Sequence, residues 1–295
     1  MAMNNTEFQE YLKKTLEEQK DIYIPVNSSF IEKIIVHNAK CTDIHPNPDD
    51  EFCYPDVGPS YRIMGEYERD IREKMIVNSI PVIEPLIVMK THPKGYMLVN
   101  GHHRWGAAIK VGVKRMPVKV INMMLEEDIK NLLERSDHDK RVTLDLDEVV
   151  FRSPYDEFVE KTKGVIARKT QKRIRLGVPA LFRYLKTHGY DIWVYSSNYY
   201  SIDTIQLMFR RYSVHVDGII CGNGKKGLYD SNKSSSINEL IANKYKTTVH
   251  IDNNSIVITK GKESQFEEFE IRDADELWSK DLIQVFEKID NNDDQ

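Results

Sequence analysis

The chain has 295 residues, of which 40% are hydrophobic and 30% charged, and its formal net charge at pH 7 is −4. This length favours two ordinary globular domains, and the negative net charge does not favour unspecific coating of DNA. The sequence has no apolar run of the roughly 20 residues that cross a bilayer and no signal pattern, which argues against a membrane or secreted protein. Three scattered cysteines, Cys41, Cys53 and Cys221, lack metal-type spacing and favour a reduced, cytoplasmic location.

The first part of the chain predicts a lead-in helix at 1–22 and a small α+β domain at 23–122. Two prolines close behind His45 favour a turn, because proline does not fit inside a helix. Apolar runs in this domain predict strands, and runs of helical period predict helices. The strands are expected at 34–37, 85–90, 96–100 and 116–121, and the helices at 68–79 and 105–110.

Residues 123–140 predict a linker helix, residues 141–290 a second domain, and residues 291–295 a disordered tail. Strands and helices alternate in the second domain, which favours a parallel sheet with right-handed crossovers. The strands are expected at 141–145, 191–196 and 247–252, and the helices at 178–189 and 235–243. The sequence therefore predicts an α/β protein.

Asp145 and Asp147 close the first strand of the second domain. Side chains alternate along a strand, so the two carboxylates share a face, and both reach one bound group once the chain bends. Two carboxylates at such a place suit a Mg²⁺ ion, a nucleophile and a proton donor. The pattern indicates phosphoryl transfer, although a single Asp-x-Asp is also common in turns.

Two further strands of this domain end in polar residues. The second strand ends at Ser196, and the last ends at Asp252, with Asn253 next in the chain. Lys233 lies between them, just ahead of a helix. Because ligands of parallel sheets bind beyond the carboxyl ends of the strands, we expect these residues to meet the aspartate pair there.

These four motifs, in this order, resemble the haloacid dehalogenase (HAD) superfamily, whose members are mostly magnesium-dependent phosphatases. The resemblance covers about residues 141–260 and implies a Rossmann-like HAD domain with a parallel sheet and a small cap. It implies that Asp145 attacks phosphorus and forms an aspartyl-phosphate. Asp147 would then exchange protons with the leaving group and with water.

The resemblance assigns Ser196 and Lys233 to the oxygens of the transferred group. Lys233 would offset the negative charge that develops there. Lys225 and Lys226 are alternatives to Lys233, because they also lie ahead of that helix.

The resemblance also implies a Mg²⁺ ion, held by Asp145, the carbonyl group of Asp147, Asp252 and Asn253. Asn253 stands where a second carboxylate is common. An amide oxygen still binds magnesium but brings no charge. A degenerate domain that binds without catalysing is therefore an alternative.

A basic stretch separates the first two motifs. From Lys161 to Lys186 there are nine Lys and Arg residues and no Asp or Glu. The stretch predicts either a solvated helix face or a lid over an anionic substrate. The residues expected to contact a phosphate-rich ligand are Arg168, Lys169, Lys172, Arg173 and Arg175.

In the first domain, Gly101, His102, His103 and Arg104 join a strand to a helix. Glycine lets the backbone approach a ligand, and the helix start offers N–H groups to an anion. Arg104 adds a guanidinium group suited to phosphate. Adjacent histidines point apart and form a poor chelate, so a structural or phosphate-contact role is favoured over a metal site.

The region at about 34–122 resembles the ParB/sulfiredoxin superfamily, through segments 45–48, 79–88 and 96–118. Members bind nucleotide at a Gly-x-x-Arg segment, which implies that Gly101 to Arg104 contact the phosphates of a nucleoside triphosphate or diphosphate. His102 stands where sulfiredoxins have cysteine, which argues against sulfinic acid repair. No helix-turn-helix region follows, which argues against chromosome partitioning. Three acids are candidates to complete the site: Glu51, Glu68 and Asp70.

Three functional hypotheses follow. The first is a magnesium-dependent phosphoryl hydrolase or transferase in the second domain, acting on a phosphorylated small molecule or nucleotide, while the first domain binds nucleotide or phosphate. The second is a kinase or nucleotide hydrolase in the first domain, beside a degenerate second domain. The third is a nucleic-acid accessory or end-processing protein that uses the basic stretch, which the net charge does not favour. No membrane partner is expected.

Overall fold

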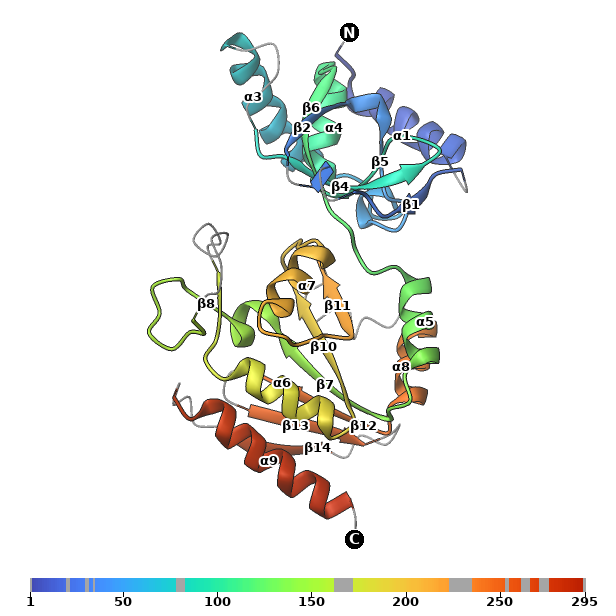
Figure 1. Ribbon diagram of the computed structural model, residues 1–295. Coiled ribbons are helices and arrows are strands. Elements are labelled where there is room, and N and C mark those ends of the chain that lie inside the picture. The colour runs from blue at the N-terminus through green and yellow to red at the C-terminus, as the bar shows by residue number, and fades with distance from the viewer. Residues whose placement is uncertain are drawn as a thin grey trace. The chain divides into compact units, whose positions relative to one another are not determined.

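The computed structural model describes residues 2–19, 22–29, 32–33, 35–77, 83–161, 172–222, 235–252, 255–260, 266–270 and 276–293. The chain forms two compact units, Met1–Asn122 and Met123–Gln295 (Figure 1). Each unit has its own hydrophobic core. Among the described residues, no helix combines the length and apolar character that a membrane crossing requires.

The first unit is built on a mixed sheet with strand order β2-β6-β4-β5-β3, and β1 also pairs with β4. The pairs β4–β6 and β3–β5 are parallel, and the other pairs are antiparallel. The strands are β1 (Ile24–Val26), β2 (His37–Lys40), β3 (Ile44–His45), β4 (Leu86–His92), β5 (Tyr96–Asn100) and β6 (Arg115–Val120). The helices are α1 (Asn5–Gln19), α3 (Tyr61–Val77) and α4 (His102–Val111), with short 3₁₀ turns at Cys41–Asp43 and Glu51–Cys53.

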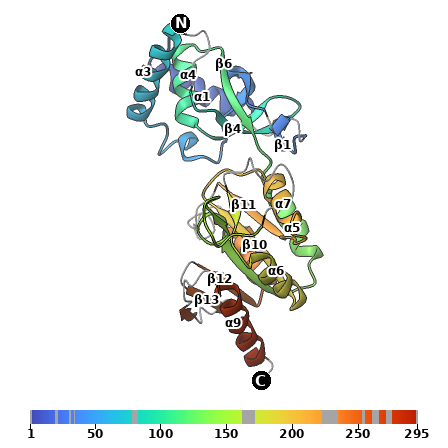
Figure 2. The same cartoon turned by 60° about the vertical axis from the view of Figure 1, so that its left-hand side comes forward.

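Helices α1, α3 and α4 lie together (Figure 2) and contribute to one hydrophobic core, which contains a cluster of aromatic rings. The ring of Phe8 in α1 lies 6.3 Å from the rings of Phe52 and Trp105, in edge-to-face geometry. Gly106 makes this packing fit, because a Cβ there would lie 2.9 Å from Met64 and 3.0 Å from Phe52. Helix α1 is therefore part of the core of this unit.

The second unit is built on a sheet with strand order β11-β10-β7-β12-β13-β14. The strands are β7 (Lys140–Asp145), β10 (Tyr190–Ser196), β11 (Gly218–Cys221), β12 (Thr247–Ile251), β13 (Ser255–Lys260) and β14 (Phe266–Glu270). The first four strands in this order are parallel, whereas β13 and β14 are antiparallel. The prediction of a purely parallel sheet is wrong at this edge. The chain between β12 and β13 is too short for the crossover that a parallel pair needs.

Helices cover both faces of this second sheet (Figure 1). They are α5 (Glu126–Arg135), α6 (Val178–Thr187), α7 (Ile202–Arg210), α8 (Ser235–Lys244) and α9 (Trp278–Asp293). Ile192 and Val194 of β10 enter the larger core, which includes residues of α6, α7 and α9. Trp193, between them, packs with residues of α5 and α8. This alternation follows the two-residue period of a strand.

An insert follows β7 and precedes α6. It starts with a π-helical turn at Leu146–Val150 and continues into a two-stranded hairpin, β8 (Phe151–Arg152) and β9 (Arg173–Ile174). Arg175, directly after β9, is fully buried, and its guanidinium group lies 4.3 Å from the ring centroid of Trp278. The prediction that Arg175 contacts a phosphate-rich ligand is therefore wrong. Arg168 and Lys169 lie outside the described residues.

Two predicted boundaries in the first unit are wrong. The strand expected at 34–37 lies at His37–Lys40, where it pairs with β6. The helix expected to begin at Glu68 begins at Tyr61 instead. Gly65 and the polar residues in this first part of α3 weaken the helical pattern, but Met64 is buried in the core and fixes the helix there.

Candidate functional site

Asp145 is the last residue of β7, and its side chain is held by the backbone that follows it. Its Oδ1 atom accepts hydrogen bonds from the N–H groups of Asp147, at 2.7 Å, and Glu148, at 2.8 Å. The residue is only 8% exposed. The π-helical turn at Leu146–Val150 brings these two N–H groups to the carboxylate. Such π-helical turns are rare in proteins, and those that occur often lie at functional sites.

The ends of three parallel strands meet at Asp145. In the sheet register, Asp145 pairs with Tyr195, so that Ser196 is the next residue along β10. On the other side, Leu144 pairs with Ile251, so that Asp252 follows beside Asp145. The residues that the sequence placed at strand ends therefore lie at one edge of the sheet.

A pair of side chains shows which face of the sheet Asp145 occupies. Thr143 and His250 are register partners on β7 and β12, and Oγ1 of Thr143 lies 2.7 Å from Nδ1 of His250. Asp145 follows Thr143 by two residues on β7, and side chains return to the same face of a strand every second residue, so its carboxylate projects from the face that holds Thr143 and His250. Asp252 directly follows the last residue of β12. Burial, with a smaller effect of Arg141, lowers the pKa of His250 to about 4.

Asp147 is the centre of a group of four donors. Its Oδ2 atom accepts hydrogen bonds from the hydroxyl group of Ser196 and from Nδ2 of Asn198, the latter at 2.9 Å. Its Oδ1 atom accepts from the hydroxyl group of Tyr200 at 2.6 Å and from Nζ of Lys172 at 3.2 Å. Both oxygens of the carboxylate are thus bound twice.

These contacts set the ionisation of the group. Burial raises the pKa of Asp147, but hydrogen bonds from Ser196, Tyr200, Asn198 and Lys172 lower it, and the net shift is downward. Burial, followed by the hydrogen bond to the carboxylate, raises the pKa of Tyr200 well above 10. Asp147 is therefore a carboxylate and Tyr200 a hydroxyl donor at neutral pH.

The donor set at the strand ends fits a magnesium ion. Mg²⁺ is usually bound by one or two carboxylates together with water and phosphate oxygens, and Asp145 and Asp252 supply two carboxylates. The backbone N–H of Asp252 donates a 2.9 Å hydrogen bond to the carbonyl of Ser255, which fixes the start of this loop. Within the described ranges, no group of three His, Cys, Asp or Glu side chains forms a closed metal site. Asn253 and Lys233, with Lys225 and Lys226, lie outside these ranges.

Lys172 was expected from the sequence to contact a phosphate-rich ligand, whereas Asn198 and Tyr200 were not predicted at the site. Their spacing could have indicated this role. Ser196, Asn198 and Tyr200 place a polar side chain at every second residue from the end of the strand onward. The loop that aligns them is fixed by Gly222. Its N–H donates to the carbonyls of Ser196 and Asn198, at 3.0 and 3.1 Å.

The first unit contains the second candidate site, at the start of α4. Gly101 adopts a left-handed conformation with φ of 99°, and a Cβ there would lie 2.8 Å from Leu86 and 3.0 Å from Arg104. Glycine is thus required for the turn from β5 into α4. The N-terminus of α4 borders a pocket of about 350 Å³, lined by Asp50, Tyr67, Glu84 and Asn100 together with Gly101, His102, His103 and Arg104.

The two histidines turn toward the segment before α3. His102 is 5% exposed, and its Nδ1 lies 3.3 Å from the carboxylate of Asp50. Nε2 of His103 accepts a hydrogen bond of 3.1 Å from the N–H of Ser60. Burial lowers the pKa of both rings, to about 4 for His102, against the opposing effect of Asp50. Both rings are therefore neutral at pH 7.

Arg104 is the cation of this pocket. Its Nη1 group pairs with the exposed carboxylate of Glu84, and its Nη2 group lies 3.4 Å from the side-chain oxygen of Asn100. Its Nε atom is buried and has no hydrogen-bond partner among the described residues. Burial lowers the pKa of Arg104. An anion at the helix start would give this guanidinium a further partner.

The acids predicted to complete the pocket are not the acids found there. Glu68 pairs with the buried Lys110, and Asp70 pairs with Lys74 at 2.8 Å on α3. Glu51 is exposed and does not line the pocket. Asp50 and Glu84 are the acids of the pocket. The spacing of residues along α3 predicts its buried face, but it does not show that Glu68 pairs with Lys110 of α4.

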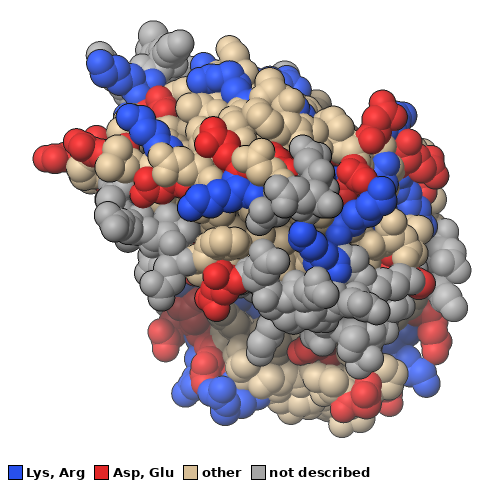
Figure 3. Space-filling model, turned by 90° about the horizontal axis from the view of Figure 1, so that it is seen from below, with Lys and Arg blue, Asp and Glu red and all other residues tan. Residues whose placement is uncertain are grey.

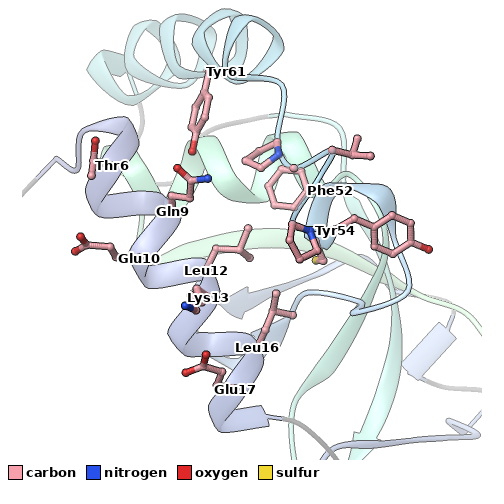
Figure 4. A pocket seen from close by; sticks show the side chains of 15 residues that line it. Thr6, Gln9, Glu10, Leu12, Lys13, Leu16, Glu17, Phe52, Tyr54 and Tyr61 are labelled. Atoms are coloured by element: carbon pink, nitrogen blue, oxygen red, sulfur yellow. The ribbon is translucent and has the colours of Figure 1, made fainter.

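A larger pocket, of about 670 Å³, lies between α1 and the segment that leads into α3. Figure 4 shows Leu12 and Leu16 of α1 on one side and Phe52 and Tyr54 on the other. Lys13 is the single cation in this lining. The mainly apolar lining suits phosphate less well than the smaller pocket at α4.

The surface charge is mixed. On the face shown in Figure 3, the described Lys and Arg side chains are interspersed with Asp and Glu. This distribution agrees with the small net charge of −4.

Residues 69–136 match the model of the ParB N-terminal domain. Two solved structures of the C-terminally truncated chromosome-partitioning protein ParB from Caulobacter crescentus are similar to this chain. The structure with CTP-γ-S has 25% identity and a TM-score of 0.25, and the match covers 36% of this chain and 56% of that one. The structure with the centromeric parS site has 23% identity and a TM-score of 0.24, covering 35% and 51%.

This chain thus spans about half the length of those structures. No curated protein matches it. The first unit contains a ParB-like segment, which continues through α5. The HAD resemblance of the second unit, with its cap and its magnesium ion, stays a prediction.

Proposed function

We propose that the second unit is a magnesium-dependent phosphoryl hydrolase or transferase that acts on a phosphorylated small molecule or nucleotide. The observation that carries the proposal is the meeting of Asp145, Ser196 and Asp252 at the ends of three adjacent parallel strands. The hydrogen bond between Ser196 and Asp147 supports it further, since it joins two of the predicted site residues.

The arrangement suits transfer in two steps. In the first, Oδ2 of Asp145 forms a bond to phosphorus, the bond between phosphorus and the ester oxygen breaks, and Asp147 gives a proton to the leaving alcohol. In the second, water attacks phosphorus, Asp147 takes its proton, and the bond to Asp145 breaks. The products are the alcohol and inorganic phosphate. Asp145 is again a free carboxylate, and Asp147 again carries the proton with which the first step began.

Asp147 is ionised in the structure, so it must take up a proton before it acts as an acid. A phosphoryl dianion near Asp147 favours this, because a neighbouring negative charge raises the pKa of a carboxyl group. Magnesium, held by Asp145, the carbonyl of Asp147 and Asp252, would reduce the charge repulsion between phosphate and carboxylate.

The test is hydrolysis of an aryl phosphate by the full chain in the presence of magnesium. We expect Asp145→Asn to lower kcat by at least about a thousandfold, because the amide is a poor nucleophile. Asp137→Asn is the matched control, because this exposed residue precedes the amino end of β7. Activity that persists in Asp145→Asn would exclude the nucleophilic role.

A second candidate function is binding of a nucleoside triphosphate or diphosphate in the first unit. The pocket at the start of α4 favours it, since it joins free helix N–H groups to the buried guanidinium of Arg104. Nucleotide should raise the melting temperature of the full chain in a concentration-dependent way. Arg104→Ala should abolish this shift, whereas Arg115→Ala, on the exposed end of β6, should keep it. Equal shifts in both variants would place the nucleotide elsewhere.

A further inference from the structure

We propose that Lys172 and Tyr200 bind the phosphoryl group of the substrate, as part of a donor cradle that the carboxylate of Asp147 fills in the structure. The proposal rests on the proposed function of the second unit and adds to it two substrate-binding residues. Neither residue belongs to the four motifs from which that function was predicted.

The first argument is the number and kind of donors. A carboxylate has about four lone-pair positions, and here each is matched by one donor group. The donors are two hydroxyls, one amide and one ammonium. A phosphoryl group also presents charged oxygens about as far apart as those of a carboxylate, so the same donors suit both anions.

The second argument is that the hairpin positions the backbone next to Lys172 and the ring of Tyr200 by contacts that do not involve Asp147. Lys172 directly precedes β9, and the hairpin pairs Phe151 with Ile174 and Arg152 with Arg173. The hairpin is anchored further by the N–H of Arg175, which donates to the carbonyl of Val150 at 2.8 Å. The fold of the insert therefore holds the backbone next to Lys172, and the ammonium group reaches Oδ1 of Asp147 from there.

Tyr200 is fixed by the same insert. Its ring meets the ring of Phe151 edge to face, with centroids 6.0 Å apart. Its hydroxyl group donates the shorter of the two hydrogen bonds to Oδ1 of Asp147. The β8–β9 hairpin thus positions both a cation and a neutral donor on one side of the carboxylate.

The third argument concerns the charge. Lys172 is 42% exposed and Asp147 is 16% exposed, so the ammonium group is the part of this ion pair that solvent and solutes reach. A dianionic phosphoryl group attracts a lysine more strongly than a single carboxylate charge does. Exchange of Lys172 and Tyr200 from Asp147 to the substrate keeps both donors bonded and leaves Oδ1 of Asp147 free for proton transfer, while Oδ2 keeps its hydrogen bonds from Ser196 and Asn198.

The experiment measures two quantities on the full chain, the KM for an aryl phosphate with magnesium and the Kd for inorganic phosphate. The variants are Lys172→Met and Tyr200→Phe. The controls are Lys161→Met, which removes the same charge from the same insert, and Tyr155→Phe, at a side chain that is 94% exposed. Lys172→Arg keeps the cation and tests whether charge is sufficient.

We expect Lys172→Met and Tyr200→Phe each to raise both KM and Kd by about tenfold to a hundredfold, as for loss of a charge-assisted hydrogen bond. The controls should leave both unchanged, and Lys172→Arg should restore most of the phosphate affinity. If kcat falls while KM and Kd stay constant, the two residues only position Asp147 and the proposal is wrong.

Phosphate binding separates this proposal from the proposed function. If the chain hydrolyses no phosphate ester but binds phosphate through Lys172 and Tyr200, the cradle stands and the catalytic assignment fails. If Asp145→Asn abolishes hydrolysis while Lys172→Met changes neither KM nor Kd, the catalytic assignment stands and the cradle fails. A wild-type chain that does not bind phosphate at all would also overturn the cradle.

Discussion

The hydroxyl group of Tyr245 donates a hydrogen bond of 2.8 Å to the carboxylate of Asp191, which is only 3% exposed. The hydroxyl group of Ser136 donates to the same carboxylate oxygen, and Nδ1 of His138 lies 2.9 Å from the other oxygen. One buried anion at the start of β10 thus joins the segment before β7 to the chain that follows α8. The network lies at the opposite end of the strands from the candidate site.

This network predicts a large loss of stability in Asp191→Ala. The substitution leaves buried donors without an acceptor, so the free energy of unfolding should fall by about 3 kcal/mol. Tyr245→Phe removes the hydrogen bond to Asp191 and the hydrogen bond of 3.3 Å that the hydroxyl accepts from Nε1 of Trp193, and it should cost about 2 kcal/mol. Urea unfolding followed by tryptophan fluorescence measures both values. Equal losses in the two variants would show that Asp191 is not the centre of the network.

The neutral state of His102 predicts how stability depends on pH. The folded pKa of about 4 lies below the unfolded value of about 6.5, so the unfolded chain binds the extra proton between these values. The contribution of His102 is therefore complete above about pH 6.5 and is lost as the pH falls toward 4. Its slope reaches at most about 1.4 kcal/mol per pH unit.

The His102 ring lies beside Asp50, and its Nε2 atom accepts a hydrogen bond of 3.4 Å from the N–H of Asn47. His102→Gln removes this titrating group but keeps a side chain that can bond to both. Chemical unfolding of the variant should show a weaker pH dependence than wild type across the same window. An unchanged slope would contradict the neutral, buried ring. The pKa of His102 is lowered because burial disfavours the charged form of the ring.

Alanine substitutions at two glycines are expected to change the stability of the first unit in opposite directions. Gly101 has a positive φ, and an added Cβ would meet Leu86 at 2.8 Å, so Gly101→Ala should cost more than about 1 kcal/mol. Gly65 lies inside α3 with no atom within 4 Å of an added Cβ. Gly65→Ala should stabilise the first unit by up to about 1 kcal/mol. Melting temperatures of the two variants should therefore move in opposite directions, and a rise in both would contradict the strained turn.

The carboxylate of Asp252 predicts the magnesium requirement of the proposed reaction. Asp252→Asn keeps an oxygen ligand but removes one negative charge, so half-maximal activity should need about tenfold more Mg²⁺. A chelator should abolish activity in both proteins, and added Mg²⁺ should restore it. Asp137→Asn should keep the wild-type magnesium dependence. An unchanged requirement in Asp252→Asn would place the ion elsewhere.

The strand ends of the second unit could be predicted from the sequence because their signal is local. Asp145, Ser196 and Asp252 each follow an apolar run, and parallel strands bring such ends to one edge. Tyr200 could not be predicted in the same way. Its loop depends on Gly222, where the ring of Tyr199 lies 2.4 Å from the position of an added Cβ. Gly222 and Tyr199 are more than twenty residues apart, and no sequence pattern indicates that they are in contact.

Helix α9 was missed because its apolar residues are few and separated by charges. It buries Trp278, Leu282, Phe286 and Ile289, which recur at helical spacing within an acidic tail. Helix α1 was predicted as a lead-in outside the domain, yet Phe8 is fully buried in the first core. A narrow apolar stripe is sufficient for a helix that covers one face, and average polarity conceals it.

The two amide hydrogen bonds to Oδ1 of Asp145 fix the orientation of its carboxylate. The carboxylate cannot rotate about its bond to Cβ without breaking both. Its second oxygen therefore keeps one direction, which the main-chain turn determines. In the proposed reaction, changes in the surrounding loops would alter which substrates enter, whereas the angle of approach to this oxygen would be set by the backbone itself.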